Sequence, residues 1–152
     1  MVDHVDSSRR SWMMAQVHGK NTKPEKAVRR ELHRLGFRFR LHRANLPGKP
    51  DIVLPKYRTA IFVHGCFWHR HPGCSKASTP QSNSSFWSEK FARNVERDLQ
   101  TAHLLRNAGW DVRVVWECET KKQSTLELTI FSLLDAVLKN RTKRTSEDID
   151  EV

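Results

Sequence analysis

Long hydrophobic runs are missing from this chain of 152 residues. No stretch approaches the roughly 20 consecutive apolar residues that a membrane-spanning helix needs, which argues against an integral membrane protein. The first twenty residues are charged and lack the apolar core of a secretory signal, so we expect no export. Internal repeats and low-complexity linkers are also absent, and the length fits one domain.

Cysteine is scarce, since the chain has three, an odd number that argues against a disulfide scaffold. Cys66, His71 and Cys74 lie within nine residues, and Cys118 follows far downstream at the end of a predicted strand. Zinc prefers four Cys and His ligands in a tetrahedral arrangement, and four protein ligands leave no open position. We therefore favour a structural zinc site; the alternative is that the cysteines are small buried hydrophobes and His71 lies on the surface.

Acidic residues are outnumbered, with 17 Asp and Glu against 27 Lys and Arg, for a net charge of +10. Residues 1–50 carry +8 of this charge, residues 51–118 carry +3, and residues 119–152 carry −1. A basic first third indicates a polyanionic partner, either nucleic acid or an anionic membrane surface. Charge that only keeps the protein soluble is the alternative.

Helical and strand-like patterns alternate along the chain. A capping box of Thr22 and Glu25 begins the first predicted helix, and Gly36 ends it. Alternating or apolar runs predict strands, and a long helical pattern occupies residues 86–108. A last amphipathic helix starts at a second capping box of Ser124 and Glu127. The predicted strands are residues 37–41, 51–54, 60–63 and 111–118.

This order predicts one α/β domain with a central mixed β-sheet flanked by helices. We assign residues 1–21 to a basic N-terminal arm and residues 22–138 to the domain. Residues 139–152 contain too few apolar side chains to pack, so we predict a disordered tail there.

A carboxylate and two histidines form the candidate catalytic group. Asp51 precedes an apolar strand, His64 ends the next strand, and His69 lies just beyond it. Mg²⁺ prefers oxygen ligands such as a carboxylate, and a histidine can take a proton from an attacking water. This combination of a carboxylate and two histidines suits metal-assisted phosphodiester hydrolysis. The alternative is that Asp51 is a turn residue and that the histidines belong to the zinc cluster.

Aromatic residues gather near the same loop. Phe67 and Trp68 are adjacent on a polar segment, so both cannot point into a core, and Trp87 begins the long helix. Exposed aromatic side chains beside basic residues suit stacking on bases or wedging between base steps. Met14 in the basic arm is a candidate for the same role.

Five motifs stand out along the chain: Pro-Gly-Lys-Pro-Asp51, Phe62-Val-His-Gly-Cys-Phe-Trp-His69, Phe86-Trp-Ser-Glu-Lys90, Asn94-Val-Glu-Arg-Asp98, and Gly109-Trp110 with the Val-Val-Trp-Glu-Cys118 segment. Together these motifs resemble the very-short-patch repair (Vsr) endonucleases. The resemblance covers roughly residues 7–138. It implies a PD-(D/E)xK-like, restriction-endonuclease-like fold and nicking of double-stranded DNA 5′ of the thymine in T·G mismatches that arise from 5-methylcytosine deamination.

The resemblance also implies roles for individual residues. Asp51 would bind Mg²⁺ with the backbone carbonyl of Val63, and His69 would be the general base. His64 would be a second catalytic imidazole. Glu25 would support the metal-bound water, with a purely capping role as the alternative. The zinc ligands would be the three cysteines and the histidine described above.

For DNA recognition, Phe67, Trp68 and Trp87 would insert beside the mismatch from the major groove and Met14 from the minor groove. Two departures from the family pattern are Val63, where Thr is frequent, and one extra residue in the Pro72-Gly73 segment before Cys74. The second carboxylate and the lysine of the generic PD-(D/E)xK pattern are missing after Asp51.

The resemblance implies a bacterial cytoplasmic monomer that is held near the nucleoid by DNA, with mismatch-repair proteins as further partners. Two other functions stay open from the sequence. One is a restriction-type nuclease that cuts matched DNA, and the other is a zinc-stabilised DNA-binding module without catalysis. Membrane-surface binding is the weakest option, because the aromatic residues cluster with metal ligands instead of lying on one helical face.

Overall fold

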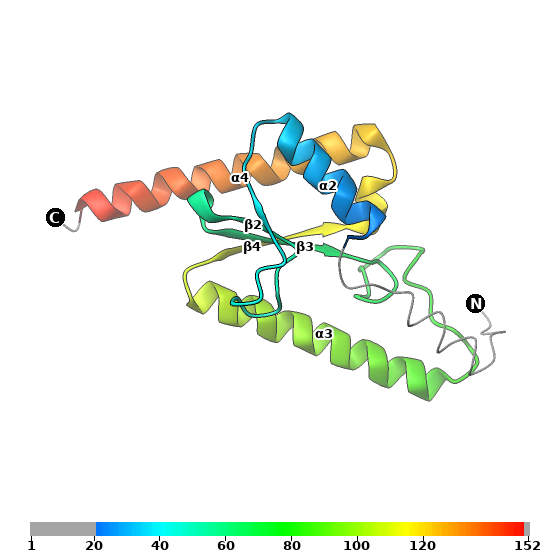
Figure 1. Cartoon of the computed structure of the whole chain (residues 1–152). Coiled ribbons are helices and arrows are strands. Elements are labelled where there is room, and N and C mark those ends of the chain that lie inside the picture. Colours follow the sequence, from blue (N-terminus) through cyan, green and yellow to red (C-terminus); the bar gives the residue numbers. More distant parts are fainter. Residues whose placement is uncertain (1–20, 151–152) are drawn as a thin grey trace.

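The computed structural model describes residues 21–150, with side chains described as far as residue 144 (Figure 1). The predicted arm, including Met14, thus lies almost wholly outside the described residues. The elements follow the chain in the order α2 (Lys23–Arg34), β1 (Arg40–Leu41), β2 (Ile52–Leu54), η1 (Pro55–Tyr57), β3 (Thr59–His64), α3 (Ser84–Asn107), β4 (Asp111–Trp116), η2 (Glu117–Thr120) and α4 (Gln123–Asp150).

Four strands form one sheet in the order β1-β2-β3-β4. The β1–β2 and β2–β3 pairs are antiparallel, whereas β3 and β4 run parallel. A parallel pair needs a long crossover, which the chain makes with a loop and α3. Helices α2 and α4 cover one face of the sheet and α3 lies on the other (Figure 1). The predicted α/β class with a central mixed sheet is therefore confirmed.

The face beneath α2 and α4 holds the main core, because alternating positions of the strands point toward these helices. Within the described residues no helix is both long and apolar enough to cross a membrane. The buried members of the main core are Ala27, Val28, Leu32, Ile52, Leu54, Ile61, Val115, Leu126, Ile130, Leu133, Leu134 and Val137.

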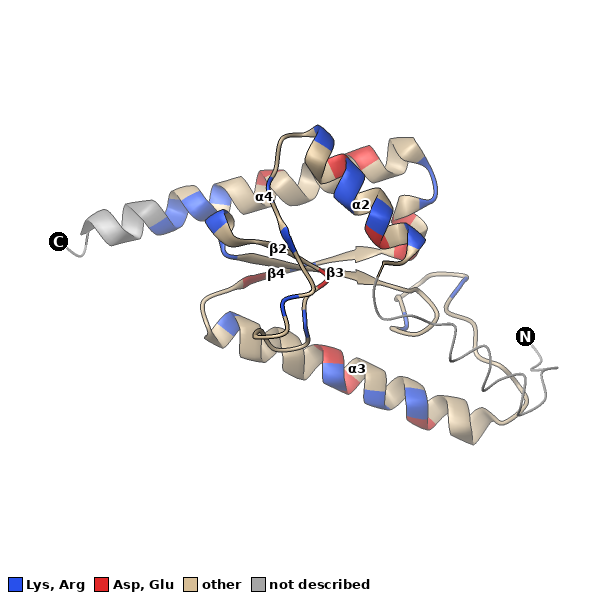
Figure 2. Cartoon of the chain, in the orientation of Figure 1, with Lys and Arg blue, Asp and Glu red and all other residues tan. Residues whose placement is uncertain are grey.

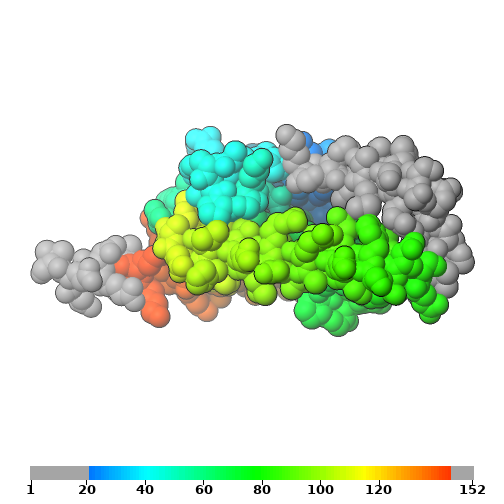
Figure 3. All heavy atoms as spheres, turned by 90° about the horizontal axis from the view of Figure 1, so that it is seen from below, coloured from blue at the N-terminus to red at the C-terminus, as the bar shows by residue number. Residues whose placement is uncertain are grey.

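The face toward α3 is much less filled. Its buried cluster contains only Ala60, Phe62 and Leu105 among the described residues. On α3 itself, Leu99 keeps 68% of its surface exposed. Helix α3 runs across this side of the molecule next to the β1–β2 segment (Figure 3), where a Cβ on Gly48 would collide with Thr101. Because few side chains fill this face, an open cleft remains between the sheet and α3.

Helix α2 begins largely as its sequence predicts. The Thr22 hydroxyl accepts the Glu25 N–H at 3.3 Å, and Gly36 follows the helix with a φ of +84°. The second half of the capping box differs, because the Glu25 carboxylate accepts the N–H of Asn21 at 2.9 Å. Glu25 is thus a capping residue whose side chain also lies in the interior.

Helix α4 differs from the prediction at both ends. It begins at Gln123, so Ser124 lies inside the helix and is not its cap. It also continues through residues 139–150, which we had predicted to be disordered. Polar side chains explain the extension: Asn140 Nδ2 donates to Asp111 Oδ2 at 3.0 Å, and Arg144 Nη2 donates to the Tyr57 carbonyl at 2.7 Å.

Two predicted strands are shorter than expected. The segment 37–41 forms a strand only at Arg40–Leu41, although its aromatic side chains do pack against the main core. Strand β4 ends at Trp116, so Cys118 lies on the η2 turn and not in the strand. The turn directs Cys118 toward the loop that follows β3, as described next.

Candidate active site and metal centres

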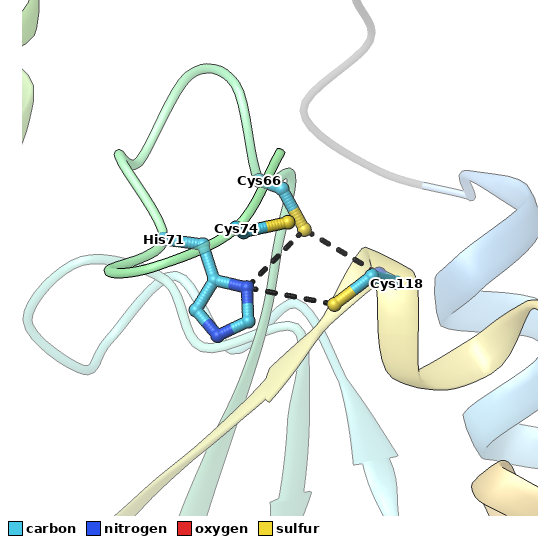
Figure 4. Close-up of side chains that lie close together, drawn as sticks. All are labelled: Cys66, His71, Cys74 and Cys118. Carbon is cyan, nitrogen blue, oxygen red and sulfur yellow. Dashed lines mark hydrogen bonds between the residues drawn. The ribbon is translucent and has the colours of Figure 1, made fainter. Parts of the chain in front are cut away.

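Four side chains from the β3–α3 loop and from η2 converge at one end of the sheet (Figure 4). They are Cys66, His71, Cys74 and Cys118, whose ligand atoms all lie within 4.8 Å of one another. The Nδ1 atom of His71 is 3.6 Å from the Cys66 sulfur and 3.5 Å from the Cys118 sulfur. The structure thus brings together all four predicted zinc ligands.

The geometry of this Cys/His cluster fits zinc. A tetrahedral ion with ordinary Zn–S and Zn–N bond lengths separates a sulfur from a nitrogen by about 3.6 Å, as seen here. Burial raises the pKa of the Cys118 thiol to about 12, so a thiolate at this position needs a cation beside it. The Cys₃His donor set is also typical of structural zinc sites.

The loop between the ligands is held by further contacts. Arg70, in a left-handed conformation with a φ of +55°, donates to the carbonyls of Phe67, Ala77 and Ser78. Gly73 takes a φ of +71°, which accommodates the extra residue before the second cysteine. The guanidinium of Arg70 and the Cys/His cluster together fix a loop that has little apolar content.

A second cluster lies beside β2 and contains Glu25, His42 and Asp51. Asp51 Oδ2 accepts the Val63 N–H at 2.8 Å, which fixes the carboxylate against β3. Burial raises the pKa of Asp51 to about 7, and the nearby Glu25 carboxylate acts in the same direction. Two carboxylates in a buried space form a site that a cation would stabilise.

The donor set of this second cluster fits Mg²⁺. Hard divalent ions prefer carboxylate and carbonyl oxygens and retain water in their remaining positions. Asp51 and Glu25 supply carboxylates from two different segments, the residue just before β2 and helix α2. A second carboxylate, which is missing after Asp51 in the sequence, thus lies near Asp51 in space.

The candidate catalytic histidines form a stacked pair. The rings of His64 and His69 lie 3.9 Å apart at an interplanar angle of 6°. Burial lowers the pKa of His64 to about 4, and the neighbouring His69 adds to this effect. His64 is therefore a neutral imidazole near pH 7.

An acidic residue from α3 orients the second histidine. His69 Nδ1 lies 2.7 Å from Asp98 Oδ2. Because a carboxylate oxygen accepts, the proton resides on Nδ1, and Nε2 of the neutral ring keeps its lone pair. His69 thus has the tautomer that a general base requires.

A cleft of about 880 Å³ between the sheet and α3 connects these groups. Its lining includes Glu25, Asp51, His64, His69 and Asp98. The cleft also contacts the aromatic loop through Trp68. The two carboxylates and the histidine pair are therefore accessible from one space.

The aromatic loop packs against α3. Phe67 meets Trp68 edge to face at 5.0 Å and contacts Trp87 and Phe91 at 5.5 and 5.1 Å. Phe67 and Trp68 are half-buried, whereas Trp87 is only 6% exposed. Trp87 thus lies behind the other two rings in this conformation.

The chain is similar to characterised nucleases over most of its length. The profile of the family described as DNA mismatch endonuclease Vsr matches residues 2–76. The type II nicking enzyme V.XorIIP of Xanthomonas oryzae pv. oryzae is 49% identical over 135 residues, which covers 89% of this chain and 98% of the relative. This chain belongs to the Vsr family. The DNA mismatch endonuclease Vsr of Escherichia coli is 40% identical over 126 residues, covering 83% of this chain and 80% of the relative.

Membership in the Vsr family makes the protein an endonuclease that acts on DNA. The surface charge agrees with a polyanionic substrate. Lys and Arg residues lie along both α2 and α3 (Figure 2). The polyanion that the net charge predicted is therefore DNA.

Sequence reasoning missed three residues of this Vsr-family site. Asp98 belongs to one of the family motifs, but no local pattern assigns it to His69. Arg70 belongs to none of the motifs, and its loop contacts are seen only in the folded chain. His42 follows β1 without any motif, and only the folded chain places it near Glu25.

Proposed function

We propose that this Vsr-family endonuclease nicks double-stranded DNA 5′ of the thymine in T·G mismatches left by 5-methylcytosine deamination, in a Mg²⁺-dependent phosphodiester hydrolysis. One observation carries the proposal: a single cleft joins the Asp51–Glu25 carboxylates, the histidine pair and the aromatic loop. The similarity to a mismatch endonuclease and to nicking enzymes supports mismatch recognition and single-strand cleavage.

Asp51 and the carbonyl of Val63 are the proposed ligands of Mg²⁺, with Glu25 supporting the metal-bound water. Bound there, Mg²⁺ would stabilise negative charge on the attacking and leaving oxygens. The Val63 N–H holds one Asp51 oxygen in place, and the carboxylate would face the cation with the other. The side chain of residue 63 takes no part, so Val is compatible with this role.

His69 is the proposed general base. The Nδ1–H of His69 donates a hydrogen bond to Asp98, so Nε2 can take a proton from the attacking water. The neutral His64 ring supports His69 from one side by stacking and is the second catalytic imidazole. His64 is the more buried of the two rings, and burial keeps it neutral near pH 7.

Zinc at the Cys/His cluster has a structural role in this proposal, since four protein ligands leave no open position. It would tie the β3–α3 loop to η2 and so hold both His69 and the aromatic residues. Phe67 and Trp68 would enter beside the mismatch from the major groove, followed by Trp87, with Met14 approaching from the minor groove. Basic residues within the first fifty would bind backbone phosphates.

The remaining expectations belong to the same proposal. The mixed sheet with flanking helices would be a restriction-endonuclease-like fold. One nick in an asymmetric lesion needs only a monomer, and the protein would work near the nucleoid of a bacterial cytoplasm, with mismatch-repair proteins as further partners.

Nicking of paired duplexes tests this function. Duplexes that differ only by T·G or C·G at one position, with varied flanking bases, are incubated with and without Mg²⁺. We expect a nick 5′ of the mismatched thymine and only when Mg²⁺ is present. Equal cleavage of matched duplexes would indicate a restriction-type nuclease, and binding without any product would indicate a non-catalytic DNA-binding module.

A further inference from the structure

His42 lies where three parts of the site meet. It follows β1 in a left-handed conformation, with a φ of +46°. Its backbone N–H donates to the carbonyl of Asp51 at 3.3 Å, and its ring reaches the Glu25 carboxylate on α2. His42 therefore connects the helix that carries Glu25 with Asp51, the residue just before β2.

Three N–H donors converge on one oxygen of Glu25. Oε2 accepts from the Asn21 backbone at 2.9 Å, from Arg29 Nη2 at 2.9 Å and from His42 Nε2 at 3.1 Å. The Asn21 and Arg29 donors come from the N-terminus and next turn of α2. Of these three donors, only the ring N–H of His42 comes from outside α2 and its cap.

The chemistry of these groups fixes the proton on His42. Arg29 Nη2 also lies 3.3 Å from His42 Nε2, but a guanidinium can only donate and a carboxylate oxygen can only accept. The contact with Glu25 therefore requires a proton on Nε2 of His42. Since a protonated Nε2 cannot accept, Arg29 then donates to Glu25 and not to His42. A charge-assisted bond to a buried carboxylate is the stronger of the two alternatives.

We propose that His42 is a positioning residue that holds the Glu25 carboxylate beside Asp51, so that Glu25 serves as the second carboxylate of the cation site. The proposal rests on the proposed function, since it takes Asp51 as a ligand of the catalytic cation. Partners that orient the groups of a metal site typically contribute 10–100-fold to metal affinity. Loss of the His42 donor would let the Glu25 and Asp51 carboxylates separate and weaken cation binding.

Cation binding by the full-length, zinc-loaded protein tests the proposal, with Mn²⁺ as a paramagnetic probe of free ion concentration. We expect His42→Leu, which lacks a donor, to weaken Mn²⁺ binding about 10-fold. His42→Gln retains an Nε2–H donor and should bind Mn²⁺ within about twofold of the wild type. His33→Leu, at an exposed histidine on α2, is the matched control and should change nothing.

The dependence of nicking on Mg²⁺ gives a second measurement. For His42→Leu we expect a half-saturating Mg²⁺ concentration about 10-fold higher, with the maximal rate retained, because His42 acts on ligand position and not on proton transfer. Wild-type Mn²⁺ affinity in His42→Leu, or an equal loss in His42→Gln, would overturn the proposal.

Failure of the proposed function gives a different result. If Asp51→Ala binds Mn²⁺ as tightly as the wild type, the assignment of Asp51 as a metal ligand is wrong. If Asp51→Ala loses Mn²⁺ binding while His42→Leu keeps it, only the role of His42 is wrong. Thermal unfolding and zinc content of each variant show whether it is folded.

Discussion

The two faces of the sheet differ in how they are filled. Helices α2 and α4 close one face with a continuous apolar core, whereas α3 leaves a cleft over the other. The carboxylates of Glu25 and Asp51 and the stacked pair of His64 and His69 line that cleft. We infer that the closed face supplies most of the stability and that the open face can hold groups that are costly to bury.

The largest expected effect concerns catalysis on the open face. His69→Ala should lower the rate of nicking about 10²–10⁴-fold, the usual contribution of a general base. Single-turnover kinetics on a T·G duplex measure it. The control is His103→Ala, an exposed histidine on α3, and a similar loss in both variants would contradict the special role of His69.

On the closed face, Ile130→Ala should lower the free energy of unfolding by about 2–5 kcal/mol, because Ile130 is fully buried between α4 and the sheet. Denaturant titration measures this loss. The rate of nicking by the remaining folded protein should stay close to that of the wild type. A large catalytic defect at full folding would show that the two faces are not separable.

The aromatic loop should show an intermediate effect. Replacing Phe67 and Trp68 with alanine should weaken binding to a T·G duplex by roughly 1–3 kcal/mol for each lost stacking contact. Binding to matched DNA, which relies on phosphate contacts, should weaken much less. Equal losses on both duplexes would argue against insertion beside the mismatch.

The smallest effect is expected for an apolar residue on the open face. Leu99→Ala should change the free energy of unfolding by less than about 0.5 kcal/mol, because the side chain is mostly exposed. The same denaturant titration gives a direct comparison with Ile130→Ala. A loss as large as that of Ile130→Ala would mean that α3 is packed much more tightly than the cleft implies.

Local signals in the sequence predicted much of this molecule. The short spacing of Cys66, His71 and Cys74, with the odd number of cysteines, singled out the Cys/His cluster, and the cap at Thr22 and the glycine at position 36 predicted the ends of α2. Alternation of apolar residues predicted the strands, although their ends moved by a few residues. These features depend on neighbours in the sequence, and for that reason a single sequence reveals them.

Contacts between distant segments were not predictable. Nothing near His42 indicates that it reaches Glu25, seventeen residues earlier, and nothing near Asp98 indicates that it pairs with His69. The extension of α4 was missed for a similar reason, since a polar helix end looks disordered until Arg144 meets the Tyr57 carbonyl. Such contacts follow from the sheet order and the helix placement.

The most direct test of the central claim is Asp51→Ala, assayed for nicking, stability and zinc content in one preparation. We expect no detectable nicking of a T·G duplex at saturating Mg²⁺ and an unchanged zinc content. Stability should equal or exceed that of the wild type, because a buried carboxylate next to Glu25 is removed. Undiminished nicking would contradict the claim that this cleft carries out the reaction.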